Sequence, residues 1–143
     1  MTRSTCFLGF LAVLTSGAVT AALAQDSGGD PKAGQLAFNN NCRTCHVTKE
    51  GDNRLGPSLH NIVGSKAGTR EGYANYSGAM KSSGVVWNEK TLDRFIENPE
   101  SVVRNNNMKP YKGIPDPKIR QNIIAYLKSQ SAGSGASSKA GES

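Results

Sequence analysis

Cys42, Cys45 and His46 are the residues whose types and spacing most clearly indicate chemistry. They form the sequence Cys-Arg-Thr-Cys-His, with two residues between the cysteines and the histidine directly after the second. This C-x-x-C-H spacing is typical of covalent haem attachment. The two sulfurs would bond to the haem vinyl groups, and His46 would be an axial ligand of the iron. The motif therefore predicts one covalently bound haem c and a role in handling electrons.

Two other uses of these residues are open from the sequence. With His60 they make two cysteines and two histidines, the donor types of many zinc sites. However, His46 directly follows Cys45 and His60 stands alone, which is not the usual zinc-finger spacing. A redox-active disulfide between the two cysteines would be expected within a βαβ pattern, and the surrounding sequence has none.

The beginning of the chain has the pattern of an export signal. Residues 1–24 carry one positive charge, Arg3, then an apolar run, and end in Ala22-Leu23-Ala24. We expect a cleaved secretory signal peptide, because the run is short and rich in small residues for a membrane anchor. Export agrees with haem attachment, which in bacteria takes place outside the cytoplasmic membrane, and it predicts a periplasmic protein.

The remainder is expected to form one small domain, residues 25–128, followed by a disordered tail, residues 129–143. The tail contains no aromatic or branched aliphatic residue and cannot bury enough apolar area to order itself. Loss of Arg3 with the signal peptide leaves a net charge of about +5. This charge favours partners with acidic surfaces, and no nucleic-acid-binding motif accompanies it.

Three segments have helix signals, and no segment alternates like a convincing strand. Asp30-Pro31 and Asp116-Pro117 each supply an N-cap followed by proline, ahead of helices over residues 32–41 and from 117 onward. Asn88 begins a third helix that Pro99 would end. Their apolar faces contain Gly34 and Phe38, then Leu92, Phe95 and Ile96, then Ile119, Ile123, Tyr126 and Leu127. The loops over residues 47–72 and 100–115 are unusually long for such a domain, so we expect them to wrap the haem and to lose their core without it.

The chain resembles the class I cytochromes c, specifically the mitochondrial-type and bacterial cytochrome c2 group. The similarity extends over most of residues 29–128. It rests on Gly34-x-x-x-Phe38, the C-x-x-C-H motif, Gly56-Pro57-Ser-Leu59-His60, Tyr76-Ser77, Trp87, Glu97-Asn98-Pro99, Met108, Gly113-Ile114 and Ile124-Ala125-Tyr126-Leu127. This resemblance implies a small all-α cytochrome c fold, with three to five helices and long loops wrapped around one haem.

The resemblance also implies roles for individual residues. The carbonyl of Pro57 would accept a hydrogen bond from His46 and fix its ring. Three residues would bind the inner haem propionate, whose burial needs donors: Tyr76, Ser77 and Trp87.

The sixth ligand of the iron could come from Met80, Met108 or His60 on residue type alone. The resemblance implies Met108, which follows Pro99 by nine residues. The resemblance implies that Met80 packs in the core and that His60 lies in a loop.

The sequence departs from the family pattern at several positions. Met108 and Gly113 are one residue further apart than usual, and Arg104-Asn-Asn-Asn107 replaces the usual lead-in to the methionine. Phe95 stands where many relatives have a tyrosine that donates to the methionine sulfur, which predicts a slightly lower potential. Ser65 stands where relatives often have an arginine near the propionates. Glu100 and Ser101 stand where mitochondrial forms have lysines that dock to partners.

The function expected from this pattern is that of a monomeric periplasmic carrier of single electrons, not an enzyme. It would contact redox partner proteins and, transiently, membrane complexes. A rival interpretation is a cytochrome subunit or dedicated electron acceptor of a periplasmic dehydrogenase. A third is a haem protein with an open iron that binds gases or peroxide.

Overall fold

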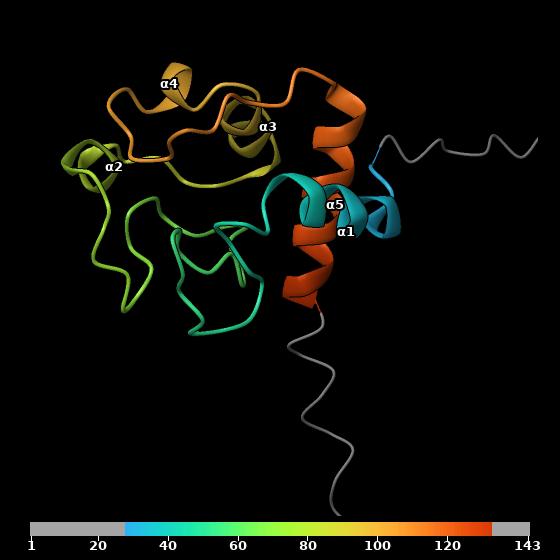
Figure 1. The fold of residues 1–143 in the computed structure, drawn as a ribbon, viewed down its shortest axis with the longest axis horizontal. Coiled ribbons are helices and arrows are strands. Elements are labelled where there is room, and N and C mark those ends of the chain that lie inside the picture. The colour runs from blue at the N-terminus through green and yellow to red at the C-terminus, as the bar shows by residue number, and fades with distance from the viewer. Residues whose placement is uncertain (1–27, 133–143) are drawn as a thin grey trace, which may run out of the picture.

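The computed structural model describes residues 28–132, which form helices joined by long loops (Figure 1). The helices are α1 (Pro31–Asn41), α2 (Gly78–Ser82), α3 (Glu89–Glu97), α4 (Pro99–Val102) and α5 (Pro117–Ala132). Within these residues the only β-type pairing is an isolated bridge between Lys66 and Val86. The all-α prediction is therefore confirmed. No helix in the described part of the chain is long and apolar enough to cross a membrane.

The predicted helix starts are present with the expected caps. The side chain of Asp30 accepts a hydrogen bond from the backbone N–H of Lys32, and Asp116 accepts one from Lys118 in the same way. Asn88 caps α3 in a reciprocal arrangement with Thr91. Pro99 does more than end α3, because Asn98 caps a further short helix, α4, in which Pro99 is the first residue.

The end of the domain lies further along the chain than the sequence indicated. We expected the ordered part to stop at residue 128, but α5 continues through Ala132. The hydroxyls of Ser129 and Ser131 donate to the carbonyls of Tyr126 and Leu127, so these serines bond within the helix. The predicted signal peptide, residues 1–24, and the rest of the predicted tail, residues 133–143, lie outside the described residues.

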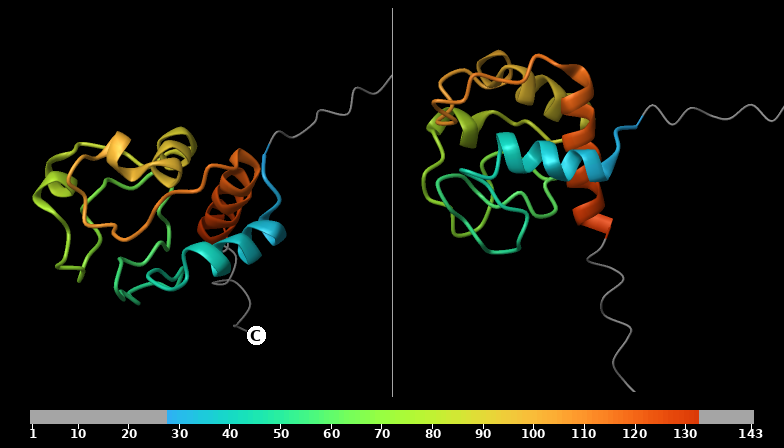
Figure 2. Two further views of the ribbon diagram at one scale, coloured as in Figure 1. Left: turned by 45° about the horizontal axis from the view of Figure 1, so that its top comes forward. Right: turned by 45° about the vertical axis from the view of Figure 1, so that its right-hand side comes forward.

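Helices α1 and α5 cross in close contact, as the views in Figure 2 show. Gly34 lies at the crossing, where a Cβ atom would overlap the carbonyl of Asn122 and lie 2.8 Å from the Cβ of Tyr126. The rings of Phe38 and Tyr126 pack beside it with their centroids 5.4 Å apart. This crossing fixes the end of α1, from which the C-x-x-C-H motif continues.

Arg120 of α5 joins three parts of the fold. Its side chain is 7% exposed, and its Nε lies 2.7 Å from a carboxylate oxygen of Asp93 in α3. The same guanidinium donates to the backbone carbonyls of Ile114 and Pro115. Because a buried guanidinium needs such partners, this network ties α5 to α3 and to the segment that leads back from Met108.

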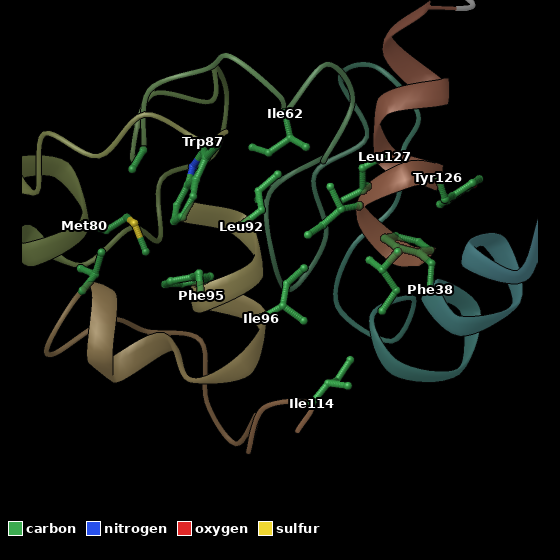
Figure 3. Packing of buried hydrophobic residues seen from close by; sticks show 14 residues of the cluster. Phe38, Ile62, Met80, Trp87, Leu92, Phe95, Ile96, Ile114, Tyr126 and Leu127 are labelled. Atoms are coloured by element: carbon green, nitrogen blue, oxygen red, sulfur yellow. The ribbon is translucent and has the colours of Figure 1, made fainter. Parts of the chain in front are cut away.

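The hydrophobic core extends from the α1–α5 crossing to the long loops. Figure 3 shows Phe38, Tyr126 and Leu127 at one end and Met80, Trp87 and Phe95 at the other. The rings of Trp87 and Phe95 lie 4.8 Å apart between their centroids. The loops are therefore held against α2 and α3 by large apolar side chains that also face a cavity.

Candidate haem site

A cavity of about 600 Å³ lies between the helices and the two long loops. Most of its wall is apolar, which suits a large flat hydrophobic cofactor. All of the site residues expected from the sequence line it: Cys42, Cys45, His46, Pro57, Tyr76, Ser77, Trp87 and Met108. Residues from far apart in the chain are thus brought to one space.

The two cysteines sit on the turn that follows α1. The backbone N–H of Cys42 still bonds to the carbonyl of Phe38 in the helix, and the N–H of His46 bonds to the carbonyl of Cys42. Neither cysteine is in a disulfide among the described residues. Burial, with a smaller effect from Cys45, raises the pKa of the Cys42 thiol to about 12. Both cysteines line the cavity, as two thioether bonds to one haem require.

His46 is held in one orientation on the cavity wall. Its Nδ1 lies 2.8 Å from the carbonyl oxygen of Pro57, which is the contact that the resemblance implies. Gly56 backs the ring so closely that a Cβ atom there would overlap the imidazole. Burial lowers the pKa of His46, although the bond to Pro57 acts in the opposite direction. The imidazole is therefore held neutral with Nδ1 occupied, which leaves Nε2 to bind iron.

The loop before Met108 is organised by its asparagines. Asn105 adopts a positive φ of 61°, a conformation that asparagine tolerates. The side chain of Asn106 is buried, donates to Glu100 and to the carbonyl of Val103, and accepts from the N–H of Met108. Asn107 donates to the carbonyl of Asn75 across the cavity wall. These bonds replace the usual lead-in sequence and place Met108 at the cavity.

The segment after Met108 is anchored to α3. The hydroxyl of Tyr111 donates to the carbonyl of Ile96 at 2.7 Å, and the backbone N–H of Ile114 donates to the same oxygen. Tyr111 also lines the cavity. The loop with the additional residue between Met108 and Gly113 is therefore held at both ends. Met108 bonds to Asn106, and Tyr111 and Ile114 bond to Ile96. The roles of Asn106 and Tyr111 have no signal in the sequence beyond their place in an irregular loop.

The other two candidate ligands differ from Met108 in their positions. Met80 is 8% exposed and packs in the core with Trp87, although part of it reaches the cavity. His60 does not line the cavity, and its ring Nε2 lies 3.0 Å from the amide nitrogen of Asn61. These positions agree with core packing for Met80 and a loop position for His60.

Tyr76, Ser77 and Trp87, the residues expected to bind a propionate, also line the cavity. The hydroxyl oxygen of Ser77 accepts from the N–H of Met80 and caps α2, which leaves its proton to donate elsewhere. The backbone of Trp87 pairs with residues 64 and 65 in both directions, at 2.7 and 2.9 Å. Burial raises the pKa of Tyr76, so its phenol stays protonated and can donate.

The donor set fits haem c better than it fits zinc. No group of three or more His, Cys, Asp or Glu side chains in residues 28–132 is arranged to hold a metal ion. A covalent haem needs instead two sulfurs at one edge, a fixed imidazole and an apolar enclosure. The cavity provides these features, since Cys42, Cys45 and His46 all border it.

Comparisons with known proteins agree with this site. The family model described as Cytochrome c matches residues 31–131. The chain is 45% identical over 103 residues to the cytochrome c2 of Rhodomicrobium vannielii, covering 71% of this chain and 80% of that one. It is 44% identical over 99 residues to the cytochrome c2 of Rhodopila globiformis, covering 69% and 92% respectively. The solved structure of cytochrome cH from Methylobacterium extorquens matches with a TM-score of 0.65 and 41% identity, covering 71% of this chain and 99% of that chain.

These relatives, the fold and the motif lead to one assignment. The family consists of electron carriers, and its C-x-x-C-H motif, here Cys42, Cys45 and His46, attaches one haem. The chain therefore belongs to the class I cytochromes c, in the cytochrome c2 group, and is a single-haem electron carrier with covalently attached haem c.

Proposed function

We propose that this cytochrome carries single electrons between redox proteins with both axial positions of the iron filled, by His46 and Met108. The observation that supports this is that His46 and Met108 line one cavity. The ring of His46 is held by the carbonyl of Pro57, and the backbone N–H of Met108 is held by the side chain of Asn106. The haem supplies the change between Fe(II) and Fe(III). A protein with two fixed ligands transfers electrons without rearranging them and has no open position for a substrate.

The remaining site residues have supporting roles in this proposal. Cys42 and Cys45 tether the haem, and Pro57 holds the ring of His46. Tyr76, Ser77 and Trp87 donate to the inner propionate, and all three line the cavity. Without such donors a buried carboxylate would be costly.

The charge of the protein supports redox partners with acidic docking surfaces. Lys109 is exposed at the cavity wall, and Lys112 follows Tyr111, which also lines the cavity. Positive charges there would guide an acidic partner toward the haem.

Electron exchange with an acidic redox partner is therefore expected to slow as ionic strength rises, because salt screens the attraction. Stopped-flow measurements over a salt series check this, and the ferrous protein should bind carbon monoxide poorly in the same buffers. A rate that does not change with salt would contradict acidic docking. Avid carbon monoxide binding would contradict two filled axial positions, and stable copurification with a dehydrogenase would identify a dedicated subunit instead.

We also propose that the protein acts in the periplasm after removal of residues 1–24. The Ala22-Leu23-Ala24 sequence and the need to attach haem outside the cytoplasmic membrane support this. Mass spectrometry of protein released by osmotic shock is expected to give an N-terminus at Gln25. Recovery only in the membrane fraction, with Met1 present, would show a retained anchor.

A further inference from the structure

Glu100 of α4 bonds to the Met108 loop, residues 104–112, which lies next to α4 in Figure 1. One carboxylate oxygen, Oε2, accepts a hydrogen bond from the backbone N–H of Asn105 at 3.1 Å. The other oxygen, Oε1, accepts from the side-chain amide nitrogen of Asn106 at 2.8 Å. Both oxygens of Glu100 are therefore used to hold the loop.

Asn106 connects Glu100 to Met108. It is 2% exposed, and its amide nitrogen donates both to Glu100 and to the carbonyl of Val103. Its amide oxygen accepts from the backbone N–H of Met108 at 2.9 Å. A carboxylate can only accept hydrogen bonds, so Glu100 requires the nitrogen of Asn106 to face it. The oxygen of the same amide is thereby turned toward Met108.

The ion pair between Glu100 and Lys109 is a weaker contact. The charged atoms lie 3.5 Å apart, and the side chains of Lys109 and Glu100 are 64% and 43% exposed. Exposed pairs of this kind stabilise a fold little. The pKa of Glu100 is lowered chiefly by the hydrogen bond from the N–H of Asn105, and less by the charges of Lys109 and Arg104. The hydrogen bonds to the loop are thus the main interactions of this carboxylate.

A glutamine cannot make the same bonds as Glu100. It has the same shape but only one acceptor oxygen, so its NH₂ group would face the N–H of Asn105 or the amide nitrogen of Asn106. One of these donors would lose its partner, and the amide of Asn106 is buried. A buried donor without an acceptor destabilises the arrangement that contains it.

We propose that Glu100 is a positioning residue for Met108, which keeps the Met108 loop closed by orienting Asn106 and so excludes other ligands from the sixth position of the iron. The inference rests on the proposed ligation of the iron by Met108. An external ligand can reach that position only when the methionine leaves and the loop opens locally. Glu100 stands where mitochondrial forms have a docking lysine, so this chain uses the position to hold the loop.

The binding of imidazole to the ferric holoprotein tests this inference, because it requires the loop to open. Glu100→Gln should bind imidazole about tenfold faster than the unmodified protein, as expected when the closed loop alone loses a buried hydrogen bond. Glu89→Gln is the matched control. Glu89 is also an exposed carboxylate, pairs with Lys128 at 2.6 Å and does not line the haem cavity. Stopped-flow absorption measures both rates, and equal rates for Glu100→Gln and Glu89→Gln would overturn the inference.

Lys109→Gln separates the hydrogen bonds of Glu100 from its ion pair. This variant removes the pair but leaves both bonds from the carboxylate to the loop, so imidazole should bind at close to the unmodified rate. A rate as fast as that of Glu100→Gln would show that the ion pair holds the loop, and the inference would be wrong.

Urea separates opening of the loop from unfolding of the whole domain. The rate of imidazole binding to Glu100→Gln should rise only weakly with urea, because a local opening exposes little surface. A dependence as steep as that of global unfolding would assign the effect to overall stability and would contradict a positioning role.

Hydrogen exchange in the unmodified holoprotein provides a measurement that needs no variant. The backbone N–H groups of Asn105 and Met108 should exchange slowly and with similar protection, because one opening of the loop breaks both of their bonds. Rapid exchange at Asn105 beside a protected Met108 would overturn the inference even if Glu100→Gln failed to fold.

The ligand assignment is tested separately by the sulfur-to-iron charge-transfer band of the ferric protein. If the band is present while Glu100→Gln and Glu89→Gln bind imidazole equally, Met108 remains the ligand and the role of Glu100 is excluded. If the unmodified ferric protein lacks the band, ligation by Met108 is wrong and the inference about Glu100 is wrong with it.

Discussion

Replacing Met108 with alanine is expected to open one axial position of the iron while the haem stays attached through Cys42 and Cys45. A thioether ligand favours the ferrous state, so its replacement by water or a nearby lysine should lower the potential. We expect a fall on the order of 0.1 V or more, within the ~0.8 V range over which axial ligands act. The sulfur-to-iron charge-transfer band of the ferric protein should vanish, and carbon monoxide should bind readily to the ferrous form. Redox titration and absorption spectroscopy check both results.

Met80→Ala and His60→Ala are the matched controls. Met80 is buried beside Trp87, so its removal should lower the free energy of unfolding by roughly 2–5 kcal/mol and yet keep the charge-transfer band. His60 lies off the cavity, and its replacement should change neither property much. If Met80→Ala abolished the band and Met108→Ala kept it, the ligand assignment would be wrong.

Loss of the haem is expected to unfold most of the domain. An empty cavity of about 600 Å³ would cost on the order of 10 kcal/mol at ~24 cal/mol per Å³, which is comparable to the whole stability of a typical domain. The double variant Cys42→Ala, Cys45→Ala should therefore accumulate poorly, with little helix and no cooperative melting. Circular dichroism during thermal unfolding is the measurement.

Arg43→Ala provides the control for that experiment. Arg43 is exposed and lies between the two cysteines, so its variant tests the motif without removing a sulfur. It should keep its haem and melt close to the unmodified protein. A haem-free double variant with native helix content and a sharp transition would show that the loops do not depend on the haem for their core.

Several features of this protein could be predicted from local sequence. The C-x-x-C-H motif needs only five consecutive residues, and the haem it implies is confirmed by membership of the family. The starts of α1, α3 and α5 follow from caps such as Asp30 and Asn88, whose bonds are made within two or three residues. Such signals are reliable because the physical interactions that produce them are short in range.

Other features depended on contacts between distant segments. The end of α5 is an exception, because Ser129 and Ser131 bond to carbonyls only three and four residues before them. The prediction stopped at residue 128 since serine has a weak intrinsic preference for helix. The Met108 loop could not be inferred from three asparagines, because its shape depends on Asn107 reaching Asn75 and on Tyr111 reaching Ile96.

The sequence by itself determined the family, the cofactor and its attachment, since each follows from residue types at short fixed spacing. Only the tertiary structure decided that Arg70, five residues beyond Ser65, donates through Nη2 to the backbone carbonyl of His60 and has its Nε buried. The physical reason is that an arginine side chain is long, so its guanidinium can reach the same place from more than one position in a loop. Sequence position therefore does not determine where that charge lies, whereas burial and hydrogen bonding in the folded chain do.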